Sequence, residues 1–141
     1  MKKITFTRLI LCIAALSLAV SITACGKQQK EEETPMVNSV DITISIDYPQ
    51  SSEMDDITQE SFTIEENSSV LEAIQLYCSV NEMPVTIETT GGTVVGINDL
   101  LNGDIFASRT WHFKINGELC SEPAGDVTLK DGDSLEWVYI K

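Results

Sequence analysis

Most apolar residues beyond position 39 of this 141-residue chain alternate with polar ones or gather in short runs. Both patterns predict β-strands, because successive side chains of a strand point to opposite faces of its sheet. The stretches concerned are residues 40–48, 61–64, 84–88, 93–97, 111–115 and 134–140. The polar and acidic segment 50–59 is predicted to be a loop. We therefore expect six or seven short strands.

One segment follows a helical period instead. Ser69 and Glu72 have the spacing of a capping box, in which each side chain bonds a backbone N–H of the first turn. One apolar stripe follows it, made of Val70, Leu71, Ile74, Tyr77 and Cys78. These features predict a single helix at about 69–81. A mixed sheet packed on that helix is an α+β, β-grasp-like fold.

The N-terminus has the layout of a secretory signal peptide. Basic residues precede an apolar run at 9–20, and small residues precede Cys25. The run is short for a membrane span, which needs about 20 apolar residues. A retained signal anchor is the alternative to cleavage.

Ile22-Thr23-Ala24-Cys25 resembles a bacterial lipobox. The resemblance implies cleavage before Cys25 and attachment of diacylglycerol to its thiol, which anchors the protein to the membrane. We expect a signal peptide at 1–24, the lipidated cysteine and a flexible polar tether at 25–39, and one domain at 40–141. The expected location is the extracytoplasmic face of the cell membrane.

The charge of the processed chain is strongly negative. Six lysines and arginines remain after residue 24 against 22 acidic residues, a side-chain balance of −16. Such a surface repels phosphate backbones and anionic headgroups. Nucleic acid is therefore excluded as a partner, and the lipid is expected to make the membrane contact.

Compact catalytic and metal-binding motifs are absent from the sequence. There is no HExxH, no CxxC and no glycine loop of the nucleotide-binding kind. Asp131-Gly132-Asp133 leads straight into a predicted strand, which favours a turn over a calcium loop. We expect a protein that is not an enzyme, with no metal site and no required cofactor.

Cys78 and Cys120 are the two cysteines of the predicted domain. Outside the cytoplasm such a pair can form a disulfide. Two free thiols are the alternative, because cysteine is common in protein cores. The sequence leaves both open.

The stretch at 111–115 holds the only histidine of the chain. Alternation assigns Trp111 and Phe113 to the core, whereas His112 and Lys114 point to the other face. Asn116-Gly117, directly after it, is a strong hairpin signal.

Residues 111–117 and 123–137 resemble the C-terminal domain of transcobalamin and intrinsic factor, and a related domain of unknown function in bacterial surface lipoproteins. The shared features are a Trp-x-Phe strand followed by Asn-Gly, and a Lys-x-Gly-Asp turn into the last strand. The start of the predicted helix also resembles that family, whereas Val127 replaces the usual aromatic residue. The resemblance covers roughly 40–141.

The resemblance implies a ligand-binding β-grasp domain. We expect an extracytoplasmic ligand-binding lipoprotein for cobalamin or another planar small molecule, working beside a transporter or a second surface protein. His112, Lys114 and Trp111 are the candidate ligand-binding residues. The alternative is a cell-surface interaction or display module that binds a protein through its strand edges.

Replacing Cys25 by alanine tests the predicted anchor. Without the thiol no lipid is attached, so the protein should leave the membrane fraction or remain unprocessed. Fractionation and the apparent mass of the protein measure both effects. A Cys25→Ala protein with unchanged size and membrane association contradicts the prediction.

Overall fold

The structure, a computed structural model, describes residues 38–141. The predicted signal peptide, Cys25 and most of the tether lie outside this range. Within it are one helix, one 3-10 turn and eight strands: β1 (Ser39–Asp47), η1 (Gln50–Ser52), β2 (Ile57–Glu65), α1 (Val70–Val80), β3 (Val85–Ile87), β4 (Val94–Ile97), β5 (Leu100–Leu101), β6 (Thr110–Ile115), β7 (Glu118–Leu119) and β8 (Ser134–Ile140). The helix found in residues 38–141 is too short to cross a bilayer.

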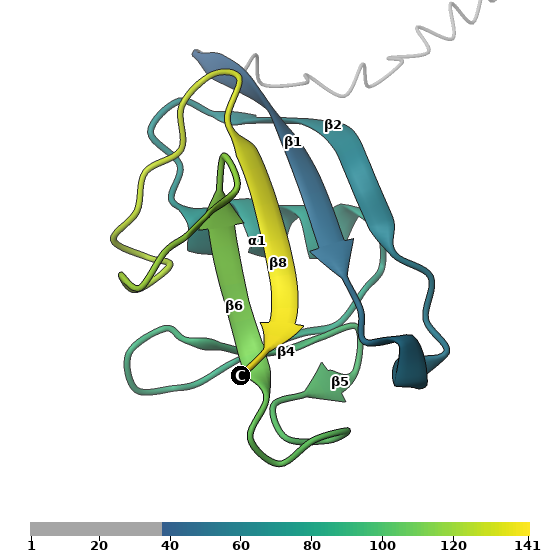
Figure 1. Cartoon of the computed structure of the whole chain (residues 1–141). Helices are drawn as coiled ribbons and strands as arrows, with labels where there is room; N and C mark the ends of the chain where they lie inside the picture. The colour runs from purple at the N-terminus through teal and green to yellow at the C-terminus, as the bar shows by residue number, and fades with distance from the viewer. Residues whose placement is uncertain (1–37) are drawn as a thin grey trace, which may run out of the picture. The chain divides into compact units, whose positions relative to one another are not determined.

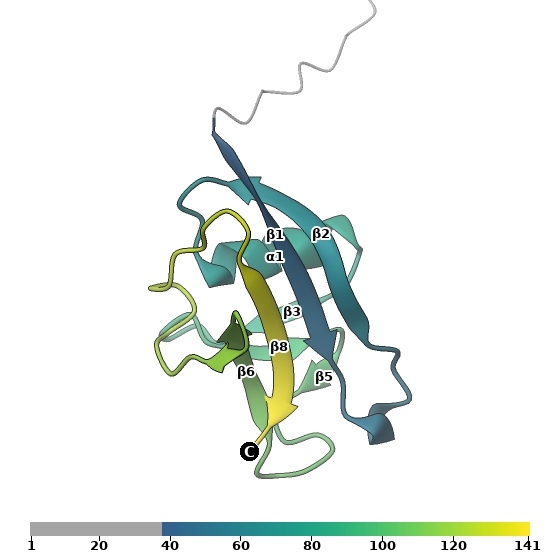
Figure 2. The same ribbon diagram turned by 45° about the horizontal axis from the view of Figure 1, so that its top comes forward.

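Five strands form the main sheet, in the order β2-β1-β8-β6-β7. β1 and β8 run parallel, and the other neighbours are antiparallel. Helix α1 crosses one face of this sheet (Figures 1 and 2). A second sheet has the order β3-β4-β5. The predicted α+β fold, a mixed sheet packed on one helix, is confirmed.

The capping box of α1 is present. The Ser69 hydroxyl accepts the Glu72 N–H at 3.2 Å, and the Glu72 carboxylate accepts the Ser69 N–H at 2.8 Å. The Ser69 hydroxyl also donates to that carboxylate at 2.8 Å, and the two bonds from the Ser69 N–H and hydroxyl favour the charged form and lower the pKa of Glu72. The helix therefore begins where the sequence predicts, and its buried residues are Val70, Ala73, Ile74, Tyr77 and Cys78.

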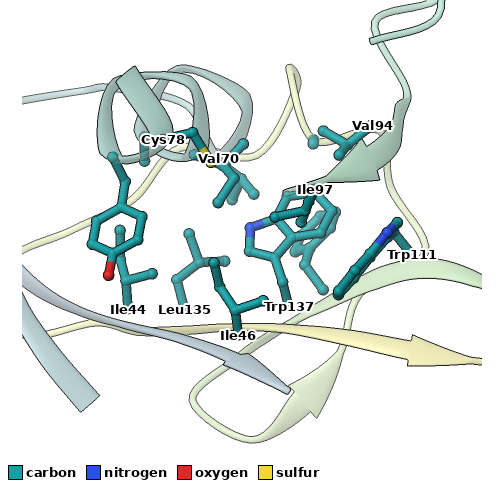
Figure 3. Close-up of a cluster of buried hydrophobic side chains, with 14 of the residues drawn as sticks. Ile44, Ile46, Val70, Cys78, Val94, Ile97, Trp111, Leu135 and Trp137 are labelled. Atoms are coloured by element: carbon teal, nitrogen blue, oxygen red, sulfur yellow. The ribbon is translucent and has the colours of Figure 1, made fainter. Parts of the chain in front are cut away.

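The core lies between α1 and the main sheet, with β4 closing one end. Figure 3 shows Ile44 and Ile46 of β1 beside Leu135 and Trp137 of β8, with Val70 and Cys78 of the helix above them. Ile97 and Val94 of β4 lie next to Trp111. Residues 38–141 thus bury a core made of their own side chains.

Segment 50–59 is only partly the loop that its polarity predicts. Strand β2 begins at Ile57, which pairs with Ile46, while Glu60 pairs with Ile44. The register shifts between these pairs, and Gln59 there has a positive φ of 49°. Side-chain polarity missed this part of the strand because Thr58, Gln59 and Glu60 are all exposed and polar, although Ile57 is half-buried and the Gln59 N–H donates to the Ser45 hydroxyl at 2.9 Å.

The hairpin predicted at Asn116-Gly117 is confirmed, with φ angles of 53° and 84°. Positive φ at both central residues is the requirement of a type I′ turn, which favours this dipeptide. The hairpin creates β7, a strand of only two residues that the alternation did not predict. Its shortness leaves most of β6 uncovered on that side.

Replacing Trp111 or Trp137 by alanine should lower the free energy of unfolding by roughly 3–5 kcal/mol, the usual loss for a buried tryptophan. Both side chains are buried, with 5% and 2% of their surface exposed. Chemical denaturation of a chain spanning residues 26–141 measures the loss.

Val80→Ala is the matched control, because Val80 is 64% exposed on α1. It should change the free energy of unfolding by about 0.5 kcal/mol or less. Tryptophan variants that unfold at the same denaturant concentration as the parent contradict the assignment of these rings to the core.

Candidate functional site

A hollow of about 720 Å³ runs along the uncovered edge of β6. Its walls are formed by the first four residues of β6, by residues of the loop that enters β4, by Asn102 and by residues 119–124. In Figures 1 and 2 the segment that follows β7 lies on the side of β6 away from β8. We call this hollow the edge groove.

Aromatic side chains form the inner wall of the edge groove. Trp111, Phe113 and Trp137 all contribute to it. The indole N–H of Trp111 donates to the Leu100 carbonyl at 2.8 Å, which fixes the ring. Phe113 packs against Trp137 with ring centroids 5.4 Å apart. Trp111 is thus held by a hydrogen bond, whereas Phe113 and Trp137 are held by packing alone, and the buried Trp137 indole N–H has no partner among residues 38–141.

The three candidate ligand-binding residues do not share one place. Trp111 and His112 line the edge groove. Lys114 does not line it, and its ammonium lies 3.2 Å from both carboxylate oxygens of Glu136. His112 Nε2 lies 2.8 Å from the Thr110 hydroxyl. The geometry therefore leaves Trp111 and His112 as candidates at this groove, with Lys114 in a surface ion pair beside it.

Asn102 lines the groove, although it was not among the candidate residues. Its side-chain oxygen accepts the backbone N–H of Trp111 at 2.7 Å. Its own N–H donates to the Val95 carbonyl at 2.8 Å, which fixes the residue against β4. The Asn102 side chain thus accepts the backbone N–H of Trp111, a hydrogen bond that a neighbouring strand would otherwise accept.

Residues 119–124 form the outer wall of the groove, and none of them was a candidate ligand-binding residue. They have neither strand alternation nor helical period. The Cys120 N–H donates to the Phe113 carbonyl at 3.1 Å, which attaches the segment to β6. No sequence signal marks this wall, because its position follows from one backbone hydrogen bond after the hairpin.

The disulfide hypothesis is corrected by the structure, in which Cys78 and Cys120 are both free. Cys78 points from α1 into the core and is fully buried, whereas Cys120 is half-buried in the groove wall. Burial in apolar surroundings disfavours the thiolate and raises the pKa of Cys78 to about 11.

The acidic turn at 131–133 serves the backbone. Asp131 accepts the Asp41 N–H, and Asp133 accepts the Lys130 N–H, each at 2.9 Å. Gly132 has a φ of 81°, a value suited to glycine. The predicted turn is confirmed.

Residues 38–141 thus form a small α+β domain with a groove at one edge of its main sheet. The chain belongs to the family described as Domain of unknown function (DUF4430), whose model matches residues 67–141. The match begins just before α1 and includes every groove residue. No curated protein matches the chain in sequence.

Solved structures similar to this one include the following two. Haptocorrin, in a crystal structure with Cbi, matches with a TM-score of 0.60 and 17% identity over 74% of this chain and 25% of haptocorrin. This chain thus corresponds to about a quarter of haptocorrin, and at that identity the likeness supports the fold alone.

The second is a candidate metal-binding protein from Ruminococcus gnavus, with a TM-score of 0.46 and 14% identity over 74% of this chain and 97% of that one. This likeness is too weak to bear on the site.

The two thiols should differ in reactivity. The thiolate is the reactive form, and Cys78 is both buried and of raised pKa, so only Cys120 should react with a thiol reagent at pH 8. The expected result is one labelled cysteine per folded chain of residues 26–141, and two after unfolding.

Cys120→Ser is the control, and it should leave no rapidly labelled thiol in the folded protein. A purified parent in which neither cysteine reacts until a reductant is added contradicts the free-thiol assignment.

Proposed function

We propose that this protein is a membrane-anchored extracytoplasmic lipoprotein that binds a planar small molecule, with cobalamin as the first candidate. The proposal is of binding and not of catalysis. The observation that carries it is the edge groove, whose volume of about 720 Å³ and aromatic inner wall are typical of small-molecule sites.

The membrane anchor in this proposal rests on the sequence. The apolar run at 9–20 and the Ile22-Thr23-Ala24-Cys25 motif support lipidation of Cys25. Residues 26–38 are mostly polar, and 13 residues can extend over roughly 40 Å at about 3.3 Å each. Such a tether would hold the domain clear of the headgroups.

Haptocorrin supports the choice of ligand by analogy of fold, a weaker ground than geometry. That protein has been crystallised with Cbi, and this chain corresponds to a quarter of its length. A corrinoid held at a strand edge would remain open on its other side. A transporter or a second surface protein is therefore the partner that we propose to complete the site.

An interaction module remains the second candidate. Strand β2 pairs only with β1 in the main sheet, so its outer edge has no neighbouring strand among residues 38–141. Such an edge can accept a strand of another protein. Capture of a membrane protein by the anchored chain, in the absence of any corrinoid binding, would favour this alternative.

Titration with cobalamin and cobinamide tests the proposed function. We expect binding in the micromolar range, about −8 kcal/mol, because a groove open on one side buries only part of the ligand. Calorimetry and absorbance of residues 26–141 measure it. If His112 coordinates cobalt, His112→Ala should abolish the shift of the corrin spectrum.

Lys114→Ala is the matched control, because Lys114 neighbours His112 on β6 without lining the groove. It should leave both the heat and the spectral shift unchanged. Absence of heat and of any spectral change with both corrinoids at sub-millimolar concentration removes them as unaided ligands.

A further inference from the structure

Strand β6 is covered unevenly on its two edges. It pairs with β8 from Thr110 to Ile115, but β7 pairs only with its last two residues, Lys114 and Ile115. The earlier part of its outer edge, which borders the edge groove, has no neighbouring strand among residues 38–141.

Hydrogen bonds show which backbone groups face this outer edge. The N–H of Asn116, directly after β6, donates to the Ser134 carbonyl at 2.8 Å. Because backbone groups alternate between the two sides of a strand, residues 114, 112 and 110 also bond to β8. Trp111 and Phe113 therefore turn their N–H and C=O groups toward the groove.

Two of these four groups are already bonded. The Trp111 N–H donates to Asn102 Oδ1 at 2.7 Å, and the Phe113 carbonyl accepts the Cys120 N–H at 3.1 Å. Between them the Trp111 carbonyl and the Phe113 N–H have no hydrogen-bond partner in the described part of the chain. Backbone polar groups away from bulk water are nearly always paired, so this gap is a place for a ligand or for water.

The two unbonded groups match a particular chemical unit. The Trp111 carbonyl and the Phe113 N–H flank His112. In parallel pairing, such an acceptor and such a donor bond the N–H and the C=O of one residue that lies opposite His112. The next backbone groups along the same edge, the Trp111 N–H and the Phe113 carbonyl, are already bonded to Asn102 and Cys120. A long strand of a partner protein therefore cannot extend the pairing, and the occupant must be short.

We propose that the edge groove binds a small molecule carrying one acylated amino-acid unit, whose N–H donates to the Trp111 carbonyl and whose C=O accepts the Phe113 N–H. Its side chain would share the face of His112, on which Leu119, the partner of Lys114 across the hairpin, also lines the groove. The inference rests on the proposed binding of a small molecule at the edge groove, and it names an amide-bearing ligand class that is distinct from the planar molecules considered first.

The direct test compares two probes that differ in one hydrogen-bond donor. N-acetyl-leucine N-methylamide has the required N–H, whereas in N-acetyl-N-methyl-leucine N-methylamide a methyl group replaces it. Each is titrated into residues 26–141 while the amide proton resonances are followed by NMR. The first probe should shift the Phe113 amide proton downfield saturably, and the second should bind roughly 10-fold more weakly, as expected for one lost hydrogen bond.

Ser121→Trp provides the test on the protein side. Ser121 is an exposed residue of the groove wall, so a large ring there should fill the groove without changing the core. Binding of the first probe should be lost. Ser51→Trp, on the exposed turn η1 and outside the groove lining, is the matched control and should bind as the parent does.

Each outcome decides the inference. Equal binding of the two probes at the groove overturns the proposed amide pairing. The proposal that the groove binds a small molecule would then remain. An unshifted Phe113 resonance with both probes up to their solubility also overturns it. The corrinoid titration is separate, so heat with cobalamin but none with the amide probe removes the ligand class and leaves the proposed function in place.

Discussion

Burial of the inner face of β8 is the constraint on which the rest of the structure depends. Leu135, Trp137 and Tyr139 are each at most 3% exposed, and β8 lies between β1 and β6 in the sheet. The last strand of the chain is thus a central one. Its parallel pairing with β1 joins the two ends of the domain, and its antiparallel pairing with β6 holds the strand that borders the groove.

The groove depends on β6 being held from one side. β8 fixes the strand along its whole length, so its outer edge can stay open without loss of order. Asn102 and Cys120 each complete one backbone group at the ends of that opening. The aromatic rings behind it are fixed by their own contacts, which makes the groove a preformed feature.

The sequence predicted those parts of the fold whose side chains meet the core. Alternation identified β1, β6 and β8 because alternate residues of each are buried, with Val138 of β8 buried as well, and the capping box identified the start of α1. Strand β2 was predicted at half its length, because exposed polar side chains carry no period. A strand that pairs mainly through its backbone has no signature in hydropathy.

The candidate site was predictable only in part, for a different reason. Trp111 and His112 stood out by residue type, and both line the groove. Asn102 and residues 119–124 did not, since they come from turns far apart along the chain. The position of residues 119–124 beside β6 depends on where β7 ends. A strand of two residues is too short to be predicted from a periodic pattern.

The proposed recognition of a ligand by backbone groups fits the charge of the domain. Residues 38–141 carry 19 acidic side chains against four lysines and arginines, of which Lys114 is paired with Glu136. An anionic ligand would meet a repulsive field on approach, whereas a neutral amide would not. A carbonyl and an N–H keep their character at any pH at which the fold persists. A site built on them can therefore work on a strongly acidic surface, where the positive charge of a surface lysine is offset by a neighbouring carboxylate, as that of Lys114 is by Glu136.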